Sequence, residues 1–210
     1  MRWLIGIGIL AIAFCLVPFF KMIAEQLMKA RQTHAISSLR QIGLALFQFE
    51  SDYGKFPDGV TASEIKRKTG SALTLSDRTS NDVFVQTLVA GVSPSELPFD
   101  SFSDSTRDPD GDWSSDATAL QHGETGFAFI PGLSPKDNPA FPIVFGPVIP
   151  GTKTVDAKSF GGKAVVLKLD NSVTSLPIDS SGKIIYDGMD LLDPRQPFWH
   201  GKAPDVKWPK

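Results

Sequence analysis

The chain begins with a long stretch that is first apolar and then amphipathic, and this stretch limits the fold more than any other feature. The run from Trp3 to Phe20 contains 18 residues and no charged side chain. At the rise of an α-helix it spans about 27 Å, close to the hydrocarbon thickness of a bilayer. We therefore predict a transmembrane anchor over residues 1–20 with the lipid bilayer as its partner. Its apolar side chains include Trp3, Leu4, Ile5, Ile9, Leu10, Phe14, Leu16, Phe19 and Phe20.

A cleaved secretory signal is the alternative to a retained anchor. Such a signal has a basic start, a short apolar core and small residues at its cleavage site. Here only Arg2 and the amino terminus are basic at the start, and the run ends in Val17, Pro18, Phe19 and Phe20, none of which is small. The retained anchor is therefore the preferred interpretation.

The charges of the chain are divided unevenly. Residues 1–49 carry five Lys or Arg and one Asp or Glu, whereas residues 50–210 carry 16 and 22. A basic segment beside an apolar run suits anionic lipid headgroups, and the mildly acidic remainder gives no electrostatic reason to bind nucleic acid. The basic residues that follow the run also mean that the positive-inside rule alone predicts a cytoplasmic head.

After Lys21 the chain becomes amphipathic, with apolar residues at helical spacing. We expect one helix to continue as a stalk over residues 21–56, because Gly54 permits a left-handed exit and Pro57 cannot extend a helix. The stripe predicts that the stalk packs on its own head domain; a coiled coil is the alternative. Its members are Ile36, Leu39, Ile42, Leu46, Phe49, Tyr53 and Phe56.

The rest of the chain predicts a small α+β head over residues 57–192. A capping box formed by Thr61 and Glu64 indicates one short helix, and a cap at residues 80–82 indicates another that ends at Gly91. Strands are expected at 126–130, 142–148, 163–169, 172–176 and 183–186, with a tight turn at Asp170-Asn171. This order predicts an antiparallel sheet laid against the long N-terminal helix.

The tail, residues 193–210, combines four prolines with Phe198, Trp199 and Trp208. Such a segment does not form regular helix or strand, yet its aromatic rings need cover. It either wraps over the head, which we favour, or offers a surface to a partner.

One loop contains candidate metal ligands. Asp108, Asp110 and Asp112 alternate around Gly111, and carboxylate oxygens in a flexible loop suit calcium. A full EF-hand loop needs a later glycine and a terminal glutamate, so a solvated acidic turn is the preferred interpretation.

Motifs for catalysis are missing from the sequence. His34, His122 and His200 lack the spacing of a zinc site, no Gly-x-Ser-x-Gly occurs, and the glycines before Lys163 do not form a phosphate-binding loop. We expect no enzyme activity, no catalytic residue, no cofactor other than that calcium and no small-molecule substrate.

The segment LRQIGLALFQFESDYGKFPDG, residues 39–59, follows the apolar helix directly. This arrangement resembles the type IV pilin and type II secretion pseudopilin superfamily, and most of all its planctomycete and verrucomicrobial members. The segment AVVLKLDNSVTSLP, residues 164–177, resembles a strand pair near the C-terminus of the same proteins. Major pseudopilins often carry a calcium-bound loop, which adds some weight to calcium in the acidic loop.

The resemblance implies a single-pass protein of the bacterial cytoplasmic membrane, with its head in the periplasm and other pilin-like or secretion-system subunits as partners. This orientation is opposite to the one that the basic residues predict, and we prefer it. One departure concerns the prepilin-peptidase site of the family, a glycine followed by Phe-Thr-Leu-x-Glu. Gly6 and Gly8 are followed by isoleucine, and Glu25 lies beyond the apolar run. Two functions therefore stay open: a structural pilin-like subunit, or a monomeric tethered binding module that does not assemble.

Overall fold

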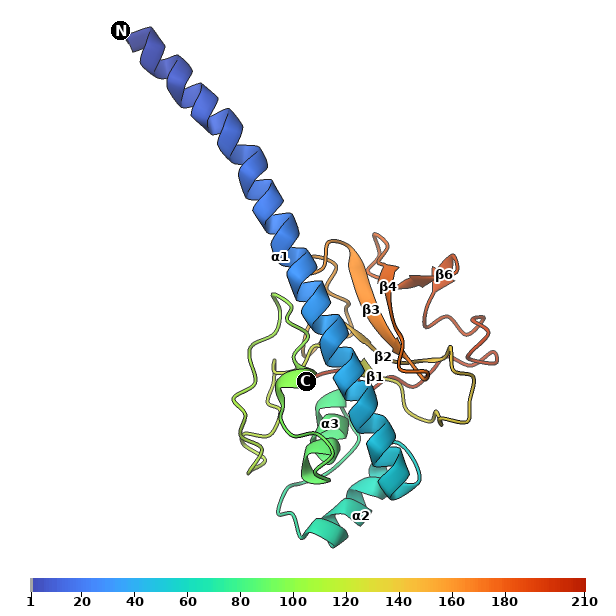
Figure 1. Cartoon of the computed structure of the whole chain (residues 1–210). Helices are drawn as coiled ribbons and strands as arrows, with labels where there is room; N and C mark the ends of the chain where they lie inside the picture. The colour runs from blue at the N-terminus through green and yellow to red at the C-terminus, as the bar shows by residue number, and fades with distance from the viewer. Residues whose placement is uncertain (1) are drawn as a thin grey trace.

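The computed structural model describes the backbone of residues 2–210 and the side chains of residues 19–210. Its longest element is α1, Arg2–Tyr53, a single helix of 52 residues. The helix ends beside Gly54, which has a φ of 78° and donates its backbone N–H to the Glu50 carbonyl. Figure 1 shows the N-terminal part of α1 projecting from the head and its C-terminal part lying against the head.

A four-stranded antiparallel sheet lies on one side of α1. Its strands pair in chain order and are β1 (Ala128–Phe129), β2 (Pro142–Gly146), β3 (Lys163–Lys168) and β4 (Val173–Pro177). The main hydrophobic core lies between the sheet and α1, and a second cluster covers the opposite face. The α+β class and the packing of the long helix on an antiparallel sheet are thus confirmed, although β1 is shorter than predicted.

The β3–β4 hairpin reaches α1 at a glycine. The tip residue Asn171 has a φ of 61°, a conformation that asparagine tolerates. A Cβ on Gly43, in the middle of α1, would overlap the side-chain oxygen of Asn171. Gly43 is therefore the position at which the helix backbone lets the hairpin approach closely. The two segments that carry the family resemblance meet at this contact.

The last predicted strand, residues 183–186, does not extend the main sheet. It shortens to β5 (Ile185–Tyr186), which pairs with β6 (Met189–Asp190) in a separate two-stranded sheet. The turn between them is Asp187-Gly188, and both residues have positive φ. An Asp-Gly pair is a strong hairpin sequence, so the sequence contained this turn and our prediction missed it.

Both short helices exist, but their caps differ from the predicted ones. The helix α2 (Gly59–Thr69) is capped by Asp58, whose Oδ1 accepts hydrogen bonds from the backbone N–H groups of Val60 and Thr61. The hydroxyl of Thr61 in turn accepts from the Asp58 N–H, so Thr61 is the third helical residue and not the cap.

The same shift occurs at α3 (Ser80–Val89), where Thr79 is the cap and Asp82 closes the capping box. The predicted cap, residues 80–82, therefore began one residue late. A short 3-10 helix, η1 (Leu97–Phe99), follows α3 and packs against α1.

The C-terminal tail lies on the head. Phe198 and Trp199 are buried, and the indole N–H of Trp199 donates to the Leu191 carbonyl. At the end of the chain the Lys210 N–H donates to the Asn81 side chain, next to the start of α3. This is the wrapped arrangement of the two that the sequence left open.

Candidate functional site

The projecting part of α1 exposes a row of large apolar side chains. Phe20 is 64% exposed and Leu27 is 50% exposed, and Phe19, Met22 and Ile23 are exposed to a similar degree. Phe20, Ile23 and Leu27 are three and four residues apart, so they lie along one side of the helix. This segment, residues 19–27, is the largest uncovered apolar feature of the described side chains.

The predicted membrane anchor lies almost entirely outside the described side chains. Phe19 and Phe20 are the only two of its named residues whose side chains are described; the others are Trp3, Leu4, Ile5, Ile9, Leu10, Phe14 and Leu16. Among the residues whose side chains are described, no helix offers a stretch that is both long and apolar enough to cross a membrane.

The C-terminal half of α1 has the opposite surroundings. Leu39 and Phe49 are fully buried, and Ile42 and Leu46 are 1% exposed, against the sheet and η1. Within the stripe, Ile36 and Tyr53 are partly exposed, and Phe56 is buried beyond the end of the helix. This half of the helix therefore belongs to the core of the head.

The three aspartates of the acidic loop do not converge. Asp110 Oδ1 accepts from the N–H of Asp112, and Asp112 Oδ1 accepts from the N–H of Ser114. The bonds from Ser114 hold the pKa of Asp112 below its usual range. In the part of the chain that the structure describes, no three His, Cys, Asp or Glu side chains are placed to hold a metal ion. Calcium at Asp108, Asp110 and Asp112 stays a prediction that this geometry does not support.

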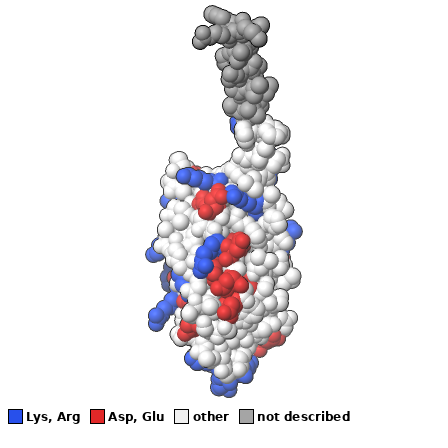
Figure 2. All heavy atoms as spheres, turned by 90° about the vertical axis from the view of Figure 1, so that its left-hand side faces the viewer, with Lys and Arg blue, Asp and Glu red and all other residues white. Residues whose placement is uncertain are grey.

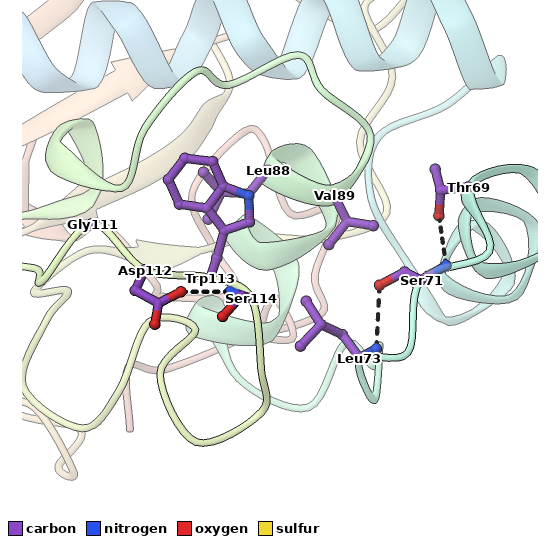
Figure 3. A pocket seen from close by; sticks show the side chains of 9 residues that line it. All are labelled: Thr69, Ser71, Leu73, Leu88, Val89, Gly111, Asp112, Trp113 and Ser114. Carbon is purple, nitrogen blue, oxygen red and sulfur yellow. Dashed lines mark hydrogen bonds between the residues drawn. The ribbon is translucent and has the colours of Figure 1, made fainter.

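The acidic loop forms one wall of a pocket of about 500 Å³. Figure 3 shows the Trp113 ring close to Leu88 of α3, with Thr69 and Ser71 on the far side. Asp112 is the one titratable group among the lining residues, so the pocket holds no pair of nucleophile and base. Its geometry suits a contact surface better than a reaction.

Two buried glutamates hold this loop on the head. Glu96 accepts hydrogen bonds from the N–H groups of Leu120 and Gly111, and Glu124 forms a 3.0 Å ion pair with Arg107. Burial raises the pKa of Glu96, and the nearby carboxylates of Glu124 and Asp110 add to the rise. Neither residue was predicted from the sequence, because single glutamates in an irregular segment have no recognisable pattern.

The three histidines stay apart in the structure. His34 on α1 stacks near Phe102 with ring centroids 5.1 Å apart, and His200 contacts Phe141. A Cβ on Gly151 would lie 3.0 Å from the His122 ring. The structure therefore gathers no histidine cluster from these three residues.

Comparison with known proteins gives one family match. Residues 28–127, a little under half of the chain, match SBP_bac_10, described as a protein of unknown function (DUF1559). This family is a prepilin-like one of the planctomycete type, so the match supports the pilin-like resemblance and gives no function. Neither the curated proteins nor the solved structures yield a match to the chain.

Proposed function

We propose that the protein is a non-catalytic, pilin-like structural component of the bacterial cell envelope. In this proposal residues 1–20 anchor it in the cytoplasmic membrane and the head lies on the outer side. The observation that carries the proposal is the division of α1 into an uncovered apolar segment, residues 19–27, and a half that is built into the head. The family match over residues 28–127 supports a place in the cell envelope.

The uncovered segment continues the apolar run without a break in the helix. Exposed Phe, Ile and Leu side chains in this number are unfavourable in water, since each buried side chain of this size stabilises a protein by about 1.5–3 kcal/mol. A bilayer or the helix of a neighbouring subunit would provide the missing cover. Both partners are consistent with a pilin-like protein, including a subunit of a type II secretion or type IV pilus-like assembly.

Alkaline extraction of membranes tests the anchor. The wild-type chain should stay in the membrane pellet, whereas Leu10→Arg should release a large share, because an arginine at the centre of a helix costs about 2.5–3.5 kcal/mol on insertion. Leu44→Arg, at an exposed leucine on the part of α1 that lies against the head, is the matched control and should stay in the pellet. Release of the wild-type chain by the alkaline wash would contradict the proposal.

The second candidate is a monomeric tethered binding module. It is favoured by the absence of the family's glutamate from the apolar run and by the pocket at Trp113. Crosslinking separates the two candidates: in a Cys15→Ser background, oxidation of Leu27→Cys in membranes should give stalk-to-stalk dimers if subunits assemble, because each chain then carries one thiol. A single monomer band at native expression would favour the binding module.

A further inference from the structure

The end of the head next to the projecting part of α1 carries a small pocket between helix and loop. The loop 157–163 meets α1 at Met28, where a Cβ on Gly161 would lie 3.8 Å from the methionine sulfur. The pocket has a volume of about 210 Å³ and is lined by Met28 and Phe160, with Lys29 of the helix and Lys163 at the start of β3 beside them. Two lysines from different elements thus flank an apolar floor.

The backbone that carries these lysines is well fixed. Ser159 is fully buried; its hydroxyl donates to Asp156 and accepts from the Asp104 N–H. The helix is also bonded to the sheet here, because the Gln32 side chain of α1 donates to the Ser175 hydroxyl of β4 at 3.0 Å. The positions of the lysine backbones are therefore set by the fold.

Four exposed lysines lie at this end of the head or on the helix that projects from it, and we call them the basic rim: Lys21 on the projecting helix, and Lys29, Lys158 and Lys163. The acidic groups beside them are Glu25, which lines the pocket, and Asp104, which pairs with Arg31 at 2.7 Å; Asp156 is buried. Counting the paired Arg31 and Asp104 as neutral, four lysines against Glu25 and Asp156 leave a charge of +2. Figure 2 shows Lys and Arg side chains across this end of the head, next to the helix, with acidic side chains directly beside them.

The spacing along α1 fits a membrane surface. If hydrocarbon ends near Phe20, then Lys29 lies about 14 Å further along the helix axis. The headgroup layer covers about 5–8 Å of that distance, and the Debye length at physiological ionic strength adds about 8 Å. Lysine side chains also extend back toward an interface. Lys29, and Lys163 in the same pocket, therefore lie within electrostatic reach of lipid phosphates.

We propose that the basic rim binds the phosphate groups of anionic lipids and so sets the angle of the head on the membrane. The proposal rests on the anchor proposed above. It extends that function, because it assigns a lipid contact to the head itself through Lys158 and Lys163, which lie outside the region of the family match.

The test measures the distance of the head from the lipid surface with the full chain in nanodiscs. In a Cys15→Ser background, a fluorophore on Ala157→Cys reports quenching by nitroxide-labelled headgroups. Quenching should rise when phosphatidylglycerol replaces part of the phosphatidylcholine, and high salt should reverse the rise. Lys29→Gln with Lys163→Gln should lower the docked-to-undocked ratio by roughly fivefold per lysine. The matched control is Lys66→Gln with Arg67→Gln, two exposed cations on α2, and it should change nothing.

The outcomes separate this inference from the proposed function. A chain that does not enter nanodiscs would overturn both. A chain that enters them, and shows equal quenching with and without anionic lipid, would overturn the lipid contact and leave the anchor standing. Added inorganic phosphate should not alter the fluorescence in phosphatidylcholine discs; a change as large as that with anionic lipid would assign the site to a soluble anion.

Discussion

Leu27 and Leu39 lie on the same helix, twelve residues apart, in opposite surroundings. Leu27 is 50% exposed, whereas Leu39 is fully buried between α1 and the head. The backbone between them is one uninterrupted helix, so the difference comes from what covers each side chain. A helix of this length is stabilised by packing more than by propensity, and the head packs against only one half. The other half needs a different partner, and the four predictions that follow test this contrast.

Truncation of the two leucines should have very different effects on the head. Leu39→Ala should lower the unfolding free energy by about 2–5 kcal/mol, because it leaves a cavity in a packed core. Leu27→Ala should change it by less than about 0.5 kcal/mol. Urea unfolding of the full chain in detergent, followed by tryptophan fluorescence, measures both. Equal losses would mean that the head also depends on the projecting segment.

Gly43→Ala should break the contact between α1 and the β3–β4 hairpin. Alanine favours the helix by about 1 kcal/mol, but its Cβ would overlap the Asn171 side chain, and such overpacking costs about 1–3 kcal/mol. We expect a net loss of unfolding free energy. The double variant Gly43→Ala with Asn171→Gly should recover stability, because glycine accepts the positive φ of residue 171. A stable single variant would contradict the close approach.

The unfolding free energy of the head should also depend on pH through Glu96. This residue precedes η1, which packs against the buried half of α1. The folded state raises the pKa of Glu96, so ionisation is less favourable in the folded than in the unfolded chain. The advantage of wild type over Glu96→Gln in unfolding free energy should therefore be largest below the ordinary glutamate range and decrease as pH rises through and just above it. Exposed aspartates with a lowered pKa make the unfolding free energy of both proteins change with pH in the opposite direction. Taking the difference between the two proteins removes that shared contribution. An advantage that grows with pH would contradict this reading.

The smallest effect is expected at the boundary between the two halves. Arg31 and Asp104 form a 2.7 Å ion pair whose side chains are partly exposed. Arg31→Ala should lower the unfolding free energy by at most about 1 kcal/mol, less in high salt. Urea unfolding at two salt concentrations measures this difference. A loss as large as that of Leu39→Ala would place the boundary of the buried half nearer the N-terminus.

Periodicity predicted most of the architecture, because burial of one helix face leaves a repeat in the sequence. The stripe at Leu39, Ile42 and Leu46 shows which side of the helix faces the head, and a short continuous apolar run marks β3. The exact caps were harder to predict, since Asp58 and Thr79 differ from their neighbours only through the hydrogen bonds that they make.

The candidate sites were less predictable from the sequence. The aspartates at 108, 110 and 112 look like metal ligands in the sequence, but Asp110 and Asp112 accept hydrogen bonds from backbone N–H groups two residues further on, which spacing alone does not reveal. Glu96 and Glu124 hold the acidic loop on the head because they are buried, and their burial cannot be recognised in the sequence. The basic rim joins Lys29 to Lys158 and Lys163, which are more than a hundred residues further along the chain, and only the tertiary fold brings them together.

The most direct test of the central claim is protease accessibility of the head in intact spheroplasts, combined with the intact mass of the chain from washed membranes. The account predicts a membrane-bound chain that keeps its apolar run, and a head that added protease digests without lysis. A head that is digested only after lysis would contradict the outward orientation, and a chain absent from the membranes would contradict the anchor.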